Sequence, residues 1–104
     1  MTTPSYSRDQ VKVLAADPDR FEMYRCAADD ALGFGLDSDD IREVFQRIDE
    51  WTFLKKEPTE KYHPGTISDY YIYFVEECLT RMFIKFLVAE GVLVVTSFKE
   101  DDNG

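Results

Sequence analysis

The chain has 104 residues, of which 44% are hydrophobic, and its formal net charge is −9. This length and apolar content predict one domain, residues 1–104, with a core of its own, and they exclude a disordered tail. The acidic charge argues against a protein that binds nucleic acid through its overall field, and no apolar run is long enough to span a membrane.

The charge is distributed unevenly along the chain. Residues 1–50 contain twelve acidic and six basic residues, whereas residues 51–99 contain six of each. The second half can therefore carry a basic surface. The start of the chain lacks an export signal, and Cys26 and Cys78 lack metal-ligand spacing, so we expect a cytoplasmic protein with reduced thiols.

A capping box near the start of the chain, alanines at helical spacing and one apolar stripe predict that the first half is mainly helical. The predicted elements are helices over residues 8–16 and 25–32, a third helix capped by Asp37 or Ser38, and a short strand over residues 21–24.

The second half is rich in β-branched and aromatic residues, which favour strands. The predicted strands cover residues 51–56, 68–75, 81–88 and 92–98, with a loop over residues 57–66. Helices followed by neighbouring strands predict an α+β fold, in which N-terminal helices pack on one face of a C-terminal antiparallel β-sheet.

The last hairpin can be aligned from its pattern. A three-residue connection, Ala89-Glu90-Gly91, sets Val88 opposite Val92. The apolar side then pairs Phe86 with Val94, Ile84 with Thr96 and Met82 with Phe98, and the other side pairs Lys85 with Val95, Phe83 with Ser97 and Arg81 with Lys99. This register keeps charged residues away from the core, which a one-residue slip would not do.

On the preceding strand we place Tyr70, Ile72 and Phe74 on the apolar side. The exposed side of the sheet then carries Asp69, Tyr71, Tyr73, Arg81, Phe83, Lys85, Ser97 and Lys99. Like charges in register cost stability, which suggests an anion between Arg81 and Lys99. Cations around aromatic rings suit unpaired RNA, although an ordinary solvated sheet face can have the same composition.

Five segments, in matching order over almost the whole chain, carry a family resemblance. They are Leu32-Gly-Phe-Gly-Leu-Asp37, Phe53-Leu-Lys55, Thr66-Ile-Ser-Asp-Tyr-Tyr71, Phe83-Ile-Lys85 and Gly91-Val-Leu-Val-Val-Thr-Ser-Phe-Lys-Glu100. Together they resemble the MqsR family, the toxins of bacterial toxin–antitoxin pairs. The resemblance implies a RelE-like fold, cleavage of mRNA without a metal or other cofactor, and neutralisation by a zinc-binding antitoxin.

The resemblance also assigns functional positions. It puts the family's two functional lysines at Lys55 and Lys99. At two other positions this chain differs, because a Gln of the family is Ser68 here and its functional Tyr is Phe83. Phe83 lacks the hydroxyl group of that Tyr, and Arg81, Tyr71 or Tyr73 could take over the role of the hydroxyl.

Metal-free RNA cleavage needs a base for the 2′-hydroxyl, a cation at the phosphate and an acid for the 5′-oxygen. We expect Lys55, Lys99 and Arg81 to be catalytic, with each lysine pKa lowered by a neighbouring cation. The expected substrate-binding residues are Lys56, Tyr71, Tyr73, Phe83 and Lys85. His63, the single histidine, could be an acid or base, but a lone loop histidine is more often only solvated.

The leading interpretation is an mRNA endoribonuclease toxin of a type II toxin–antitoxin system, with RNA and an antitoxin as partners and no membrane. The alternative is a catalytically weak domain that keeps the fold and acts by binding protein or RNA. Phe83, Ser68 and a pI near 4.4 favour the alternative. A small-molecule enzyme has no supporting motif.

Overall fold

The computed structural model describes residues 3–59 and 63–101. The predicted helices and strands are present, with ends shifted by one or two residues, and part of the predicted loop, residues 60–62, lies outside the described residues. In chain order the elements are α1 (Arg8–Ala16), η1 (Pro18–Arg20), β1 (Phe21–Met23), α2 (Arg25–Gly33), α3 (Ser38–Phe45), η2 (Ile48–Glu50), β2 (Thr52–Pro58), β3 (Ile67–Val75), β4 (Thr80–Ala89) and β5 (Val92–Glu100).

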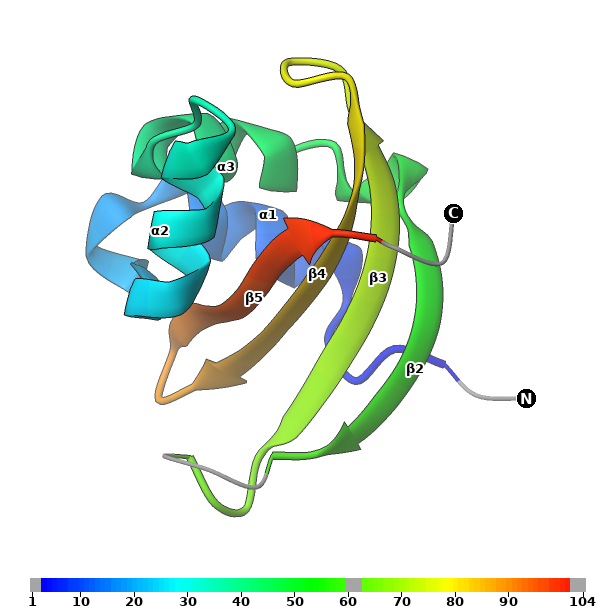
Figure 1. The fold of residues 1–104 in the computed structure, drawn as a ribbon. Coiled ribbons are helices and arrows are strands. Elements are labelled where there is room, and N and C mark those ends of the chain that lie inside the picture. The colour runs from blue at the N-terminus through cyan, green and yellow to red at the C-terminus, as the bar shows by residue number, and fades with distance from the viewer. Residues whose placement is uncertain (1–2, 60–62, 102–104) are drawn as a thin grey trace.

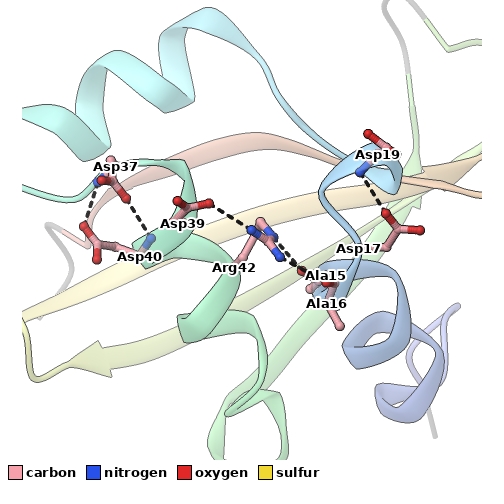
Figure 2. A network of polar contacts seen from close by, with 8 residues as sticks. All are labelled: Ala15, Ala16, Asp17, Asp19, Asp37, Asp39, Asp40 and Arg42. Carbon is pink, nitrogen blue, oxygen red and sulfur yellow. Dashed lines mark hydrogen bonds and ion pairs between the residues drawn. The ribbon is translucent and has the colours of Figure 1, made fainter.

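The helices begin at the residues that their capping patterns indicate. Ser7 Oγ accepts the N–H of Gln10 at 3.0 Å, which caps α1 as predicted. Asp37, not Ser38, caps α3: its carboxylate accepts the N–H of Asp40 at 2.9 Å, while the Asp40 carboxylate accepts the N–H of Asp37 at 3.0 Å (Figure 2). These bonds satisfy amide groups that have no partner within the helix.

Arg42 joins α3 to the end of α1 (Figure 2). Its guanidinium donates to the carbonyls of Ala15 and Ala16 at 2.9 and 3.0 Å, and to the Asp39 carboxylate at 2.8 Å. A cation at a helix C-terminus is favourable because it meets carbonyls left without partners and the negative end of the helix dipole. The contact therefore ties α3 to the C-terminal end of α1.

The strands form one sheet in the order β1-β5-β4-β3-β2. β1 lies parallel to β5, which the antiparallel prediction missed, and the other neighbours are antiparallel. The helices lie together on one side of the curved sheet, as predicted, and none of them covers the other side of β2, β3 and β4 (Figure 1). Among the described residues, no helix has the length and apolar character to cross a membrane.

The core lies between the helices and the inner face of the sheet. Phe45 of α3 is its centre, with ring centroids 4.8 Å from Trp51, 5.5 Å from Phe86 and 5.7 Å from Phe21. The pairs are edge-to-face, an arrangement that favours aromatic rings beyond the area they bury. Met82, Ile84 and Phe86 of β4 all point into this core, as predicted.

The predicted register of the last hairpin is wrong. The connection is a two-residue turn, Glu90-Gly91, with both residues at positive φ, so Ala89 pairs with Val92 and Phe86 with Val95. A bulge at Thr96 then shifts the pairing by one residue. The pairs beyond it are Lys85 with Ser97, Ile84 with Phe98, Phe83 with Lys99 and Met82 with Glu100.

The two irregularities change which residues share a face. The shorter turn moves Val94 to the outer face, opposite Leu87, and the bulge returns Phe98 to the core where it was predicted. Arg81 is therefore not opposite Lys99. Its in-register neighbour on β3 is Phe74, and its backbone carbonyl accepts the N–H of Asp101 at 2.9 Å.

The predicted faces of β3 are also wrong. Tyr71 and Val75 are fully buried in the core and Tyr73 packs against it, so Tyr70, Ile72 and Phe74 lie on the outer face instead. The reason is the four-residue turn between Val75 and Thr80, which sets Ile72 opposite Phe83. The same alternation places Asp69 on the inner side, where its carboxylate accepts the backbone N–H groups of Ser5 and Tyr6 at 3.0 to 3.2 Å.

Candidate RNA-binding face

The outer face of the sheet gathers basic and aromatic side chains from four strands. We call it the lysine–aromatic face and define it by Lys55 of β2, Tyr70 of β3, Phe83 and Lys85 of β4, and Lys99 of β5. The register brings these residues together, because Tyr70 pairs with both Lys55 and Lys85, and Phe83 pairs with Lys99. A bulge at Leu54 puts Lys55 on this face.

Two aromatic rings form the centre of the face. The centroids of Tyr70 and Phe83 are 5.7 Å apart, and the rings are inclined by 59°. The ammonium groups of Lys55 and Lys85 lie 4.9 and 5.1 Å from the Tyr70 centroid, and that of Lys99 lies 5.5 Å from the Phe83 centroid. Each distance is within the range of cation–π attraction.

Lys55 has a carboxylate partner on the same face. Its ammonium forms an ion pair with Glu57 at 2.5 Å, and this hydrogen bond raises the pKa of Lys55 and lowers that of Glu57. The expected lowering of the Lys55 pKa by Lys56 is therefore wrong, because neighbouring residues of a strand point to opposite faces. The raised pKa favours the charged form of the Lys55 ammonium.

Arg81 lies on the same side of β4 as Phe83 and Lys85, at one end of the face. Its Nε and Nη2 atoms both lie 3.0 Å from Oδ2 of Asp101. Among the residues that the structure describes, no acidic side chain forms an ion pair with Lys85 or Lys99. Lys55 on the face and Arg81 at its end are thus paired with carboxylates, whereas Lys85 and Lys99 form no ion pair within the described part of the chain.

Three of the expected substrate-binding residues lie elsewhere. Lys56 follows Lys55 on β2 and pairs with Asp69, on the inner side. Tyr71 is fully buried, and its burial together with the charge of Asp69 raises the pKa of Tyr71 to about 12, so its hydroxyl stays protonated at neutral pH. Tyr73 stacks on Trp51, with ring centroids 5.8 Å apart.

Two further candidates from the sequence have local roles. Ser68, at the position of the family's glutamine, is buried, and its hydroxyl lies 2.7 Å from that of Thr59. His63 lies in the loop before β3 and stacks on the ring of Tyr24 at 6.1 Å. Neither side chain belongs to the lysine–aromatic face.

Sequence reasoning missed Tyr70, which it assigned to the core. The available signal was the length of the turn after β3, since Glu76 to Leu79 form a four-residue connection that reverses the assignment of the strand's faces. Tyr70 is half-buried on the outer face, with a cation from each neighbouring strand beside it.

Chemically, the face suits a flexible polyanion. Its cations can contact phosphates, and the aromatic rings give it an apolar centre that suits unpaired bases. Within residues 3–59 and 63–101, no group of three or more His, Cys, Asp or Glu side chains could hold a metal ion.

The comparisons with known proteins agree with the earlier resemblance. No protein with a curated function matches the chain. The family model described as "Motility quorum-sensing regulator, toxin of MqsA" matches residues 3–100, which is nearly the whole chain. The match includes every strand that builds the lysine–aromatic face. The chain therefore belongs to the MqsR toxin family and is a toxin of a toxin–antitoxin system, with an antitoxin of the MqsA kind as the implied partner.

Proposed function

We propose that this chain is a metal-independent endoribonuclease that cleaves mRNA in the cytoplasm and is held inactive by its antitoxin. The observation that carries the proposal is the lysine–aromatic face, where three lysine ammonium groups lie within 5.5 Å of a Tyr70 or Phe83 ring. Membership of a toxin family adds a reason to expect a harmful activity that a partner must neutralise.

The proposed reaction is an internal transesterification of RNA. A base removes the proton of a 2′-hydroxyl, the 2′-oxygen attacks the adjacent phosphorus, and the bond from phosphorus to the 5′-oxygen breaks as that oxygen receives a proton. The products are a 2′,3′-cyclic phosphate and a free 5′-hydroxyl, and no redox partner or metal is needed.

The residues have different proposed roles. Lys55, whose pKa is raised, and Arg81 stabilise charge on the phosphate. Lys99 is the candidate for proton transfer, because no described carboxylate pairs with it and it lies beside Phe83. Lys85 binds the backbone of the substrate, and Phe83 contacts a base.

The test is single-turnover cleavage of a mixed-sequence RNA in EDTA. We expect Lys99→Ala and Arg81→Ala each to lose activity by about 10²–10³-fold, the usual cost of removing an electrostatic stabiliser. Arg25→Ala is the matched control, since Arg25 is an exposed cation on the helical side. Activity that disappears in EDTA, or that survives both substitutions, contradicts the proposal.

A second candidate function is RNA or protein binding without efficient cleavage. It is favoured by Phe83, which lacks a hydroxyl, and by the ion pairs that occupy Lys55 and Arg81. Expression of the chain without an antitoxin separates the two functions, because a nuclease should arrest growth and a binding domain should not. If the wild type cuts no RNA but Phe83→Tyr does, the binding function is the present one.

A further inference from the structure

Tyr70 occupies an unusual position at the centre of the outer face. β3 lies between β2 and β4, and Tyr70 pairs with Lys55 on one side and with Lys85 on the other. Both ammonium groups lie about 5 Å from the centroid of its ring, at 4.9 and 5.1 Å. One aromatic side chain is thus shared by two cations from different strands.

The arrangement has a physical consequence for the two lysines. Lysine side chains have four rotatable bonds, so free ammonium groups on a sheet surface sample many positions, and two of them repel each other. Attraction to the electron-rich ring limits both side chains to the space around Tyr70, and the ion pair with Glu57 restrains Lys55 as well. The ammonium groups are therefore held near the surface of the face before a ligand arrives, which reduces the entropy lost on binding.

We propose that Tyr70 is a positioning residue, whose ring holds Lys55 and Lys85 in place so that both contact the same stretch of RNA backbone. This inference rests on the proposed function and deepens it. The ring is the part required, because both ammonium groups lie over it, at 4.9 and 5.1 Å from its centroid. Tyr70 is not itself a stacking platform, since lysines approach it from both neighbouring strands.

The position of Phe83 supports this division of roles. Its centroid lies 5.7 Å from that of Tyr70, and one ammonium group, that of Lys99, contacts it. Phe83 is on β4, which is flanked by β3 and β5, and only β5 contributes a lysine beside its ring. Phe83 is thus the ring that can stack on a base, while Tyr70 organises the cations beside it.

The experiment compares two substitutions of Tyr70. The probe is a single-stranded oligodeoxynucleotide, which lacks the 2′-hydroxyl and cannot be cleaved, and the readouts are its Kd and the slope of log Kd against log salt. We expect Tyr70→Leu to weaken binding about 3–10-fold and to lower the salt slope, as loss of two cation–π contacts implies. Tyr70→Phe, which keeps the ring, should recover most of that loss.

Phe74→Leu is the matched control. Phe74 lies on the same strand and the same face, is 49% exposed, and pairs with Arg81. Its substitution removes an aromatic ring of similar size without removing either lysine contact, and we expect Kd to change less than twofold. If Tyr70→Leu binds like the wild type, or Tyr70→Phe loses as much as Tyr70→Leu, the ring does not position the lysines.

A measurement without RNA separates this inference from the proposed function. In NMR spectra, the terminal methylene protons of Lys55 and Lys85 should show ring-current shifts that disappear in Tyr70→Leu and remain in Tyr70→Phe. If the wild type neither binds the oligonucleotide nor cleaves RNA, the proposed function fails, and these shifts alone decide the inference. Their absence from the wild type overturns it, and their presence with the expected response to both substitutions supports it.

Discussion

The two faces of the sheet use the same strands in opposite ways. On the inner face, Tyr71 stacks on Phe86 with centroids 5.6 Å apart and is fully buried, with the guanidinium of Arg8 5.5 Å from the centroid of its ring. On the outer face, the adjacent Tyr70 is half-buried and contacts two ammonium groups. One peptide bond thus separates a tyrosine that stabilises the fold from one that we assign to binding, and only the direction of the side chain decides which is which.

The largest expected effect is the loss of stability when the ring of Tyr71 is removed, compared with the loss when that of Tyr70 is removed. We expect Tyr71→Ala to lower the free energy of unfolding by about 3–5 kcal/mol, the usual cost of deleting a buried aromatic ring, and Tyr70→Ala to lower it by about 1 kcal/mol or less. Urea denaturation measures both values. Tyr71→Phe is the control, because the buried hydroxyl has no partner among the described residues, so its removal should cost little. Equal losses at positions 70 and 71 would contradict the assignment of the faces.

The second prediction concerns how the buried carboxyl group of Asp69, on the inner face, makes stability depend on pH. Burial raises the pKa of Asp69 above its ordinary value of 3.8, although the backbone N–H groups of Ser5 and Tyr6 oppose the rise. The folded protein then holds the proton more tightly than the unfolded chain does. The stability contributed by this group is present below pH 3.8 and is lost as the pH rises through the folded pKa.

This dependence can be measured by comparison with Asp69→Asn, which cannot ionise. From urea denaturation at several pH values between about 4 and 7, the stability of the wild type relative to Asp69→Asn should fall as the pH rises. A relative stability that increases with pH would show that the hydrogen bonds to the N-terminal segment, and not burial, dominate the Asp69 pKa.

Much of this fold could be predicted from the sequence, because its signals are local. The cap at Ser7 and the apolar stripe of α3 locate helices. The alternation of Met82, Ile84 and Phe86 with Arg81, Phe83 and Lys85 assigns the faces of β4 correctly. These patterns depend on residues a few positions apart, so tertiary packing does not change them.

The pairing of the strands could not be predicted in the same way. The predicted faces of β3 and much of β5 failed because turn length and bulges set the alternation, and one residue more or less reverses it. Thr96 is an example: nothing in a Val-rich strand marks it as the extra residue that returns Phe98 to the core. Phe83 and Lys85 were nevertheless placed on the outer face, because the pattern of β4 was clear. Lys99 was placed there because the shorter turn and the bulge at Thr96 cancel each other beyond the bulge. Lys55 was assigned only by the family resemblance, and the bulge at Leu54 turns it to this face.

The third prediction tests the turn that sets the alternation of β5. Gly91 has φ of +76°, and a Cβ atom there would lie 3.0 Å from Nη1 of Arg20. We expect Gly91→Ala to lower the free energy of unfolding by about 1–2 kcal/mol, the cost of a left-handed conformation for a residue with a side chain. Gly33→Ala is the control, because Gly33 ends α2 with open space around it, and its substitution should be neutral or slightly stabilising. Equal effects on thermal unfolding would show that the turn does not require glycine.

The smallest expected effect is on the affinity for nucleic acid when the carboxylate of Glu57, on the outer face, is removed. Glu57 holds the ammonium of Lys55 at 2.5 Å, so an RNA phosphate must compete with it. Glu57→Gln removes the competing charge but keeps the shape of the side chain. We expect affinity for a single-stranded oligodeoxynucleotide to rise about 2–5-fold at low salt, the scale of an exposed ion pair, and the gain to shrink as salt increases.

Removal of any acidic residue from a chain of net charge −9 would help an anion to bind, so the gain needs a control for overall charge. Glu43→Gln makes the same change on α3, on the opposite side of the sheet, and should raise affinity by much less. The gain from Glu57→Gln should also vanish when Lys55 is replaced by Ala. An equal gain from both glutamine variants, or a gain that persists without Lys55, would mean that the outer face responds only to total charge and that Lys55 is no phosphate contact. A gain confined to Glu57 and dependent on Lys55 would identify the exposed ion pair as the contact that RNA displaces.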